Sequence, residues 1–305
     1  MSSFPVQLKA PAFHRQRLLL FLLEFAGQGL GALELQKLLL LYTKETQSPH
    51  YAFVPFRYGG YSFHCSDDLE LLEKQGWIAS GGGRISLKVD LRKQRWAAAS
   101  PERESVRWWF HRNPVRGDAL VAETYRRYPY YAIFSEIAMQ YLSPREMEDV
   151  ASLRVSFGGK NDLVTFTIGY EGILLEDYLN RLIQNGVRVL CDVRGNPRSR
   201  KFGFSDGMLS RILPQIGIKY VHFPQLGVES SKRQNLNSPE DYDELFSDYR
   251  RELPRRREAL EKLRNLLEGE NRVALTCFEK DPHSCHRHCI SDFLQSEYGY
   301  RIEHL

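Results

Sequence analysis

Side chains suited to acid/base chemistry directly follow apolar runs in the C-terminal half of this 305-residue chain. Asp192 and Arg194 end the run VRVLCDVR, and Glu279 ends the run RVALTCFE. In a hydrolase, a carboxylate of this kind can take a proton from water while a second group holds or protonates the substrate. We therefore predict Asp192 and Glu279 as the catalytic residues.

The residues around Asp192 predict a phosphate-binding loop. Residues two apart on a strand point to the same face, so Asp192 and Arg194 would share one crevice. Arg194 can hold a phosphate through two parallel hydrogen bonds. With Arg194 we predict four more substrate-binding residues in this loop: Ser199, Arg200, Lys201 and Phe202. The structural alternative is an ion pair between Asp192 and Arg194 that ties the strand end to the next helix.

The segment CFEKDPHSCHRH combines thiols, imidazoles and a carboxylate. Such residue types include zinc ligands, but the cysteine spacing is not the paired C-x-x-C of common zinc sites. We therefore predict no metal ligands and no cofactor. If a helix starts near Cys285, His286 points away from Cys285, and His286 and Arg287 lie at an N-terminus that attracts an anion. We predict Cys277, His286 and Arg287 as substrate contacts, with small core cysteines as the alternative.

A glycine-bounded turn, Gly169-Tyr170-Glu171-Gly172, follows another apolar run. Its backbone amides could cradle a phosphate or sugar, and Tyr170 could stack on a base. We predict Tyr170 and Glu171 as substrate-binding residues. An ordinary strand-to-helix turn is the alternative.

These segments belong to an alternating pattern of strands and helices. Apolar runs at 163–170, 187–194, 218–224, 272–279 and 300–305 are separated by helical patterns, one of which should break near Pro254. The alternation predicts an α/β domain over residues 162–305, a Rossmann-like three-layer fold with a mostly parallel sheet. Ligands of such sheets bind beyond the carboxyl ends of the strands, where the candidate residues should converge.

The N-terminal half has a different pattern. Helical periodicity over 15–27, 31–44 and 68–76 precedes a glycine-rich hairpin at 77–89, which predicts a winged-helix domain over residues 1–95. Ser66 is the expected N-cap of the third helix. The pattern of residues 96–155 predicts a helical connector, whose last helix starts with a capping box at Ser143 and Glu146. Residues 156–162 are predicted to be a linker. Aromatic residues of the connector, such as Trp108 and Trp109, either stack on nucleic acid or pack between helices.

Composition sets outer limits on function. Hydrophobic residues make up 42% and charged residues 26%, which is typical of globular proteins, and the net charge of +4 permits a nucleic-acid partner. Apolar runs are too short for a membrane span, and the first residues lack a signal-peptide pattern, so we predict no membrane association. Five cysteines are an odd number without disulfide-framework spacing, which favours the reducing cytoplasm.

The C-terminal half resembles a known family. GYEG, DVRGNPRSRKFGF, IKYVHFPQLG and CFEKDPHSCHRH follow one another in the order and spacing of the domain of unknown function 488 family, over about residues 162–305. Val228 departs from the pattern, because a second glycine is common there. The resemblance implies no settled activity, and action on nucleic acid or nucleotides is suspected for some relatives.

The N-terminal half has a looser resemblance to winged-helix domains of the Panacea antitoxin type. ELQKLLLLY, the YGGYS turn and DLELLEKQGWI carry it, over about residues 13–93. This resemblance implies a winged-helix fold that could contact DNA.

Together these features lead to the hypothesis of a DNA-directed hydrolase. A DNA glycosylase-like enzyme that excises a modified or damaged base, in repair or in antiviral defence, fits the carboxylates, arginines and aromatic residues. One alternative is a nuclease in which Asp192 and Glu279 hold Mg²⁺. Another is a non-enzymatic regulator that senses a nucleotide and binds an operator. DNA is the expected partner. A homodimer is the second expected assembly.

Overall fold

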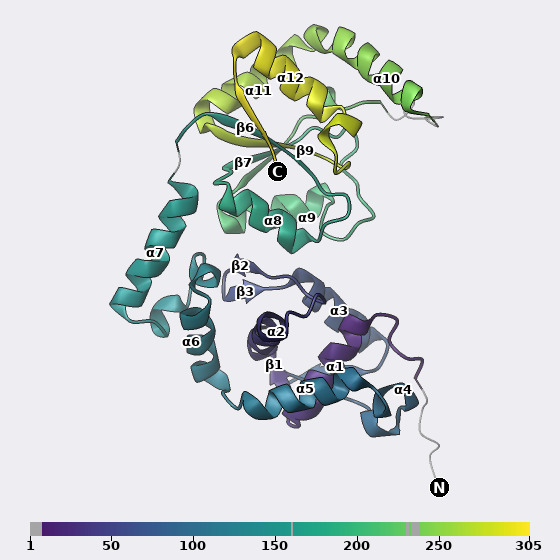
Figure 1. Cartoon of the computed structure of the whole chain (residues 1–305), viewed down its shortest axis with the longest axis vertical. Helices are drawn as coiled ribbons and strands as arrows, with labels where there is room; N and C mark the ends of the chain where they lie inside the picture. Colours follow the sequence, from purple (N-terminus) through teal and green to yellow (C-terminus); the bar gives the residue numbers. More distant parts are fainter. Residues whose placement is uncertain (1–7, 160, 230–231, 233–237) are drawn as a thin grey trace. The chain divides into compact units, whose positions relative to one another are not determined.

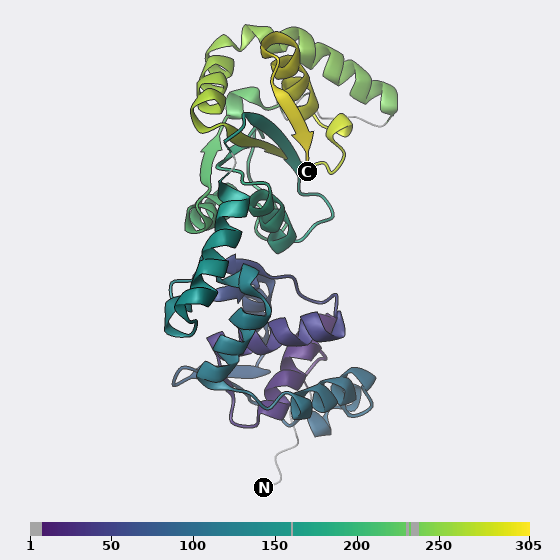
Figure 2. The same ribbon diagram turned by 60° about the vertical axis from the view of Figure 1, so that its left-hand side comes forward.

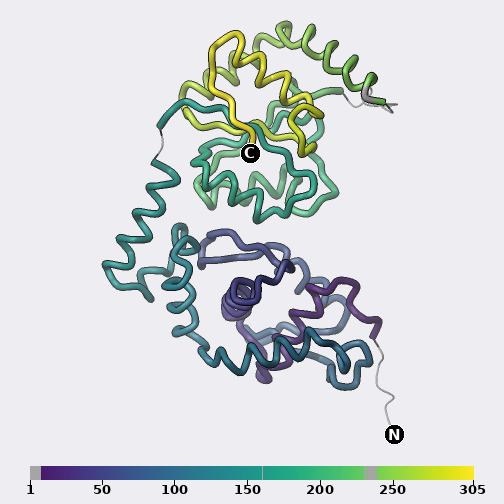
Figure 3. The backbone as a smooth tube through the Cα atoms, in the orientation of Figure 1, coloured from purple at the N-terminus to yellow at the C-terminus, as the bar shows by residue number. Residues whose placement is uncertain are grey.

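The computed structural model describes residues 8–159, 161–229, 232 and 238–305. The chain divides into two compact units, residues 1–151 and 152–305 (Figures 1 and 3). Each unit has its own buried core, so each can be described by itself. No helix within the described part of the chain has the length and apolar character that a membrane span requires.

The first unit is mainly helical, with short strands. Its helices are α1 His14–Ala26, α2 Ala32–Thr46, α3 Phe63–Lys74, α4 Arg95–Ala98, α5 Pro101–Arg112 and α6 Gly117–Arg127. Helix α7 Pro144–Gly158 begins in this unit and ends in the second. Its strands are β1 Leu30–Gly31, β2 Val54–Phe56, β3 Gly59–Tyr61, β4 Ile78–Gly81 and β5 Arg84–Leu87. The predicted glycine hairpin is confirmed, because β4 pairs antiparallel with β5 around Gly82 and Gly83, both at positive φ. Strand β1 extends this hairpin to a three-stranded sheet.

The ends of the helices agree with the sequence patterns in part. Ser143 and Glu146 form the predicted capping box, since Ser143 N donates to the Glu146 carboxylate and Glu146 N to Ser143 Oγ. Helix α7 nevertheless continues to Gly158, into the predicted linker. The prediction of Ser66 as the cap of α3 is wrong: the cap is Ser62, whose hydroxyl accepts from Cys65 N at 3.3 Å. Phe63 and Cys65 are buried, so apolar contacts extend the helix one turn earlier.

The second unit is the predicted three-layer α/β domain. Five parallel strands have the order β10-β6-β9-β7-β8. They are β6 Val164–Gly169, β7 Val189–Asp192, β8 Lys219–His222, β9 Arg272–Cys277 and β10 Arg301–His304. The crossovers contain the helices α8 Leu175–Gln184, α9 Asp206–Ile212, α10 Pro239–Glu252, α11 Arg257–Glu270 and α12 Arg287–Tyr298. All residues of β6, β7 and β9 are buried, which explains why these strands read as continuous apolar runs.

Helices cover both faces of this sheet. Helices α8 and α9 lie on one face, and α11 and α12 on the other (Figures 1 and 2). Alternate residues of β7 and β9, including Cys191 and Leu275, share a buried core with Leu263 of α11 and Ile290 of α12. On the opposite face, the Tyr178 hydroxyl of α8 donates to Thr276 Oγ1 of β9 at 2.8 Å.

The long charged segment before β9 breaks where a proline predicts it. Helix α10 ends at Glu252, a short 3-10 turn spans Leu253–Arg255, and α11 begins at Arg257. Pro254 has no N–H to donate and its ring clashes with the preceding turn, so one continuous helix is excluded.

Candidate functional site

The carboxyl ends of β6, β7 and β9 bring most of the predicted site residues to one edge of the sheet. Register pairs Gly169 with Cys277 and Asp192 with Thr276. Because neighbouring residues on a strand point to opposite faces, Asp192 and Cys277 lie on different sides of the sheet. The predicted residues therefore form two clusters. The first, on the α8 side, contains Asp192 and Arg194, and the second, on the α12 side, contains Cys277.

In the first cluster, Asp192 and Arg194 form a buried ion pair. Arg194 Nε donates to Asp192 Oδ1 at 2.8 Å, and Nη2 donates to Oδ2. Asp192 Oδ1 also accepts from Arg194 N at 3.1 Å, and Oδ2 accepts from the Tyr220 hydroxyl at 2.7 Å. Both carboxylate oxygens are thus engaged inside the fold, and Asp192 has no exposed surface. This is the ion pair named above as the structural alternative.

Burial and the charge of Asp192 shift the pKa values of Arg194 and Tyr220. Burial acts to lower the pKa of Arg194, but hydrogen bonds and charge attraction from Asp192 outweigh it and raise the pKa. Burial, followed by the negative charge of Asp192, raises the pKa of Tyr220. Tyr220 therefore remains a hydrogen-bond donor to Asp192 over the physiological pH range.

Tyr170 is part of the same cluster rather than an open stacking surface. Its hydroxyl accepts from Arg194 Nη1 at 2.7 Å, and its ring stacks on Phe204 with centroids 4.4 Å apart and planes 8° from parallel. The Tyr170 carbonyl accepts from Lys201 Nζ, and burial lowers the pKa of Lys201. Tyr170 is buried and its ring is packed against Phe204, Phe278 and Arg194, so a base could stack on it only after some of these side chains moved.

The loop after Arg194 is the more accessible part of this edge. Arg198 and Arg200 are exposed, whereas Ser199, Lys201 and Phe202 are half-buried. The Ser199 hydroxyl accepts from Lys201 N at 3.1 Å, which shapes the loop locally. The exposed arginines are available to a polyanion.

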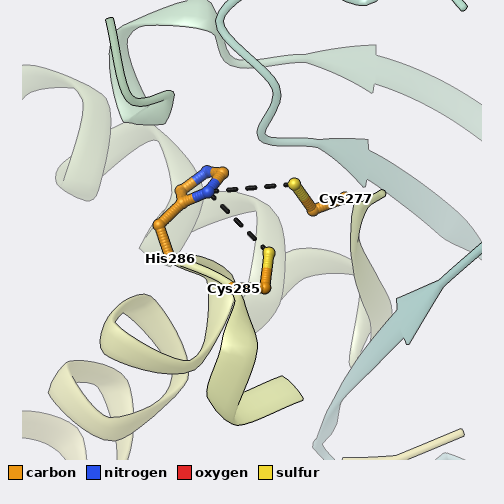
Figure 4. A group of neighbouring side chains, drawn as sticks. All are labelled: Cys277, Cys285 and His286. Carbon is orange, nitrogen blue, oxygen red and sulfur yellow. Dashed lines mark hydrogen bonds between the residues drawn. The ribbon is translucent and has the colours of Figure 1, made fainter. Parts of the chain in front are cut away.

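The second cluster consists of Cys277, Cys285 and His286 (Figure 4). His286 Nδ1 lies 3.8 Å from Cys277 Sγ and 3.8 Å from Cys285 Sγ. All three side chains are buried, and the three atoms lie within 4.8 Å of one another. Burial raises the pKa of the Cys285 thiol well above its usual range, and Cys277 raises it further.

This grouping corrects the expectation that His286 points away from Cys285. Helix α12 begins at Arg287, so Cys285 and His286 precede it. Cys285 has an extended backbone, with φ −143° and ψ 138°, and helical spacing does not apply to it. The Pro282–Ser284 turn places Cys285 and His286 against the end of β9.

Arg287 holds the loop that carries Glu279. Its guanidinium donates to the carbonyl oxygens of Glu279 and Lys280, at 2.5 and 2.9 Å. With 1% of its surface exposed, Arg287 does not present its side chain to solvent as the anion-binding prediction requires. The Glu279 carboxylate is half-buried, and its Oε2 lies 3.4 Å from Cys277 Sγ.

The turn after β6 is locked to the same loop. Tyr170 N and Glu171 N both donate to the Phe278 carbonyl, at 3.1 and 2.8 Å. The Glu171 carboxylate accepts from Lys280 N at 3.0 Å. These amides already have acceptors, so they do not offer the predicted phosphate cradle. A Cβ atom on Gly169 would lie 1.8 Å from the Glu279 carbonyl oxygen, and only glycine permits this approach.

Two residues of this edge were not predicted from the sequence. Phe278 is 42% exposed and forms a T-shaped pair with Tyr170, with centroids 5.3 Å apart. The sequence signal for it was its place between Cys277 and Glu279, two residues predicted to lie in the site. Tyr220 lies next to Leu190 in the sheet register, on the face of Asp192, but this pairing requires knowledge of the strand order.

The fold and the two clusters define an α/β domain with a thiol–imidazole–carboxylate site at the carboxyl edge of a parallel sheet. Residues 174–294 match the family described as Domain of unknown function DUF488. This match confirms the resemblance of the C-terminal half, and it includes the second cluster and the Asp192–Arg194 pair but not the turn after β6. No curated protein and no solved structure matches the chain.

Proposed function

We propose that the chain is a DNA-directed hydrolase of the DNA glycosylase type, with Glu279 as its acid/base residue. The observation that carries the proposal is the half-buried Glu279 carboxylate on a loop that Arg287 and the turn after β6 hold in place. A carboxylate in such surroundings can exchange protons with a substrate while its position stays fixed.

Exposed aromatic and basic residues of each unit support a nucleic-acid substrate. Phe278, next to Glu279, is 42% exposed, and an extruded base could stack on its ring. Arg198 and Arg200 supply exposed positive charge for phosphates on the loop after β7. In the first unit, Trp108 is 61% exposed with Arg112 4.4 Å above its ring, whereas Trp109 is buried and donates to Glu45.

In the proposed reaction, Glu279 takes a proton from water. The water oxygen bonds to C1′ of the sugar, and the C1′–N bond breaks with its electron pair passing to the departing base. The proton then moves to that base nitrogen. Asp192 is not the base in this scheme, because both of its carboxylate oxygens are engaged within the fold.

The Mg²⁺ nuclease and the nucleotide-sensing regulator are the competing functions. A Mg²⁺ site at Asp192 would require breaking its hydrogen bonds to Arg194 and Tyr220. We propose a cytoplasmic location for the enzyme, which is in keeping with five cysteines of which none is disulfide-bonded. DNA is the proposed partner, and a homodimer remains a prediction.

The test is incubation of the full chain with DNA that carries a panel of modified bases, with free base detected by mass spectrometry. Release of one base, leaving an alkali-labile site, is expected. Glu279→Gln should slow release by roughly 100-fold or more, the usual contribution of a general base. Glu261→Gln, at an exposed position on α11, is the matched control and should keep full activity.

Other outcomes separate the alternatives. Strand breaks that require Mg²⁺ would favour the nuclease. A sequence-specific footprint without base release would favour the regulator, if Asp192→Ala keeps the operator affinity but loses the nucleotide response. Base release that is unchanged in Glu279→Gln would refute the proposed site.

A further inference from the structure

We propose that Cys277, Cys285 and His286 bind one zinc ion, next to Glu279. The inference goes beyond the proposed function and does not depend on its substrate. It rests on the positions of the ligand atoms, on the hydrogen bond that fixes the His286 ring and on the type of donor in the cluster.

The ligand atoms have nearly the spacing that zinc needs. With Zn–S and Zn–N bonds of about 2.3 and 2.1 Å at a tetrahedral angle, a sulfur and a nitrogen ligand lie about 3.6 Å apart. Both Sγ–Nδ1 distances in the cluster are 3.8 Å. The dashed lines of Figure 4 converge on one ring nitrogen, with the two sulfur atoms on the same side of it. A single ion can therefore reach all three atoms with only small side-chain adjustments.

The His286 ring is held in the orientation and tautomer that a ligand requires. Its Nε2 lies 3.0 Å from the Val193 carbonyl oxygen, and a carbonyl only accepts, so Nε2 carries the hydrogen. Nδ1 then presents its lone pair to the two sulfur atoms. Tyr249 packs edge-on against the ring, with centroids 5.5 Å apart. A histidine that binds a metal through one nitrogen usually donates from the other to such an acceptor.

The donor set selects a soft divalent ion. Two thiolates and one imidazole favour zinc over Mg²⁺ or Ca²⁺, which prefer oxygen. Two thiolates also balance the charge of Zn²⁺ in a buried place, where an unbalanced charge is unfavourable. The elements that carry the ligands are well anchored, since Cys277 ends β9 and the loop to α12 is tied by Arg287.

Three protein ligands leave one position for water. The half-buried Glu279 lies beside this position, since its Oε2 is 3.4 Å from Cys277 Sγ. Catalytic zinc sites commonly combine three protein ligands, a bound water and a carboxylate that accepts the water proton. If the proposed hydrolysis is correct, zinc would lower the pKa of the attacking water, and this extension rests on the proposed function.

The first experiment measures metal content without any substrate. The full chain, purified from zinc-supplemented cells, should contain one zinc per molecule. Replacement by Co²⁺ should give a sulfur-to-metal charge-transfer band and the strong visible bands of tetrahedral cobalt. Cys277→Ala, Cys285→Ala and His286→Ala should each weaken zinc binding by at least about tenfold, the lower range of losses at zinc sites.

Matched controls come from the other buried cysteines of the same unit. Cys191→Ala and Cys289→Ala remove thiols that lie outside the cluster and should keep one zinc. Circular dichroism of every variant shows that it is folded. The proposal is overturned if the folded wild-type chain binds neither zinc nor cobalt, or if the three cluster variants bind zinc as tightly as wild type. It is also overturned if Cys277 and Cys285 form a disulfide in the chain purified under reducing conditions.

Metal binding and base release can fail separately. If the chain binds one zinc but releases no base, the metal site is supported and the proposed function is refuted. If the chain releases base equally well with and without zinc, the proposed function is supported and the role of zinc in activating water is refuted.

Discussion

The two clusters at the carboxyl edge of the sheet differ in how their polar atoms are satisfied. Asp192 and Arg194 meet within the fold, and Tyr170 and Tyr220 complete their hydrogen bonds. Cys277 and Cys285 each contact His286 Nδ1 with their sulfur atom at 3.8 Å, and sulfur makes only weak hydrogen bonds. Charged residues at a strand end are therefore a poor guide to a functional site when they form ion pairs with each other inside the fold. Thiol and imidazole groups that lie close together are a better guide.

The largest expected effect comes from breaking the first cluster. Asp192→Ala leaves the buried Arg194 guanidinium without its carboxylate, which should lower the free energy of unfolding by about 3–5 kcal/mol. All four tryptophans lie in the first unit, so hydrogen exchange of peptides from β6, β7 and β9 is the suitable measurement. Glu258→Ala, which removes an exposed ion pair with Lys262, should change little. An unchanged exchange rate in Asp192→Ala would contradict the structural role of the pair.

A smaller loss is expected when only one hydrogen bond of the pair is removed. Tyr220→Phe deletes the hydroxyl that donates to Asp192 Oδ2 and should reduce stability by about 1.5–3 kcal/mol, the range for hydrogen bonds to charged groups. The same exchange measurement applies. Zinc content should stay at the wild-type level, because Tyr220 lies on the other face of the sheet. Loss of zinc would show that the clusters are not separable.

Gly169→Ala tests the contact between the turn after β6 and the second cluster. The added methyl group would overlap the Glu279 carbonyl, so the loop must shift, at an expected loss of about 1–3 kcal/mol. Metal affinity and base release should both fall with it. Gly207→Ala, in α9 with open space around the added atom, is the control and should be neutral or slightly stabilising. Equal stability and equal metal affinity of the two variants would refute the proposed contact between the turn after β6 and the second cluster.

Lys37, in the first unit, is a buried basic residue that donates to a carbonyl group, in contrast to Arg194, which is paired with a carboxylate. Lys37 Nζ donates to the Tyr58 carbonyl and lies 5.1 Å from the Tyr125 ring, and burial lowers its pKa to about 7. Between this pH and about 10.4, the unfolded lysine pKa, the unfolded chain holds more protons, so Lys37 makes stability rise with pH.

Lys37→Met should remove this contribution, which is at most about 1.4 kcal/mol per pH unit. Denaturant unfolding followed by tryptophan fluorescence measures it, since the tryptophans report on the first unit. Lys44→Met, at an exposed position on α2, is the control and should keep the wild-type pH slope. If Lys37→Met keeps that slope as well, the lysine is charged in the fold at neutral pH.

The sequence predicts the sheet of the second unit well because buried parallel strands are continuous apolar runs. It also predicts which residues end those strands, and so the edge at which they meet. It does not predict the partition into two faces, because side-chain direction depends on the strand order that pairs Asp192 with Thr276. The thiol–imidazole cluster was missed for a local reason: helix α12 begins two residues after Cys285, so helical spacing misplaced His286.

The approach of Gly169 to Glu279 has a thermodynamic consequence. The loop between β9 and α12 is fixed at Phe278, Glu279 and Lys280 by contacts made when the domain folds. Its conformational entropy is therefore lost during folding and not again when an ion or substrate arrives. A ligand at this edge meets a preorganised loop, so more of its contact energy remains as affinity.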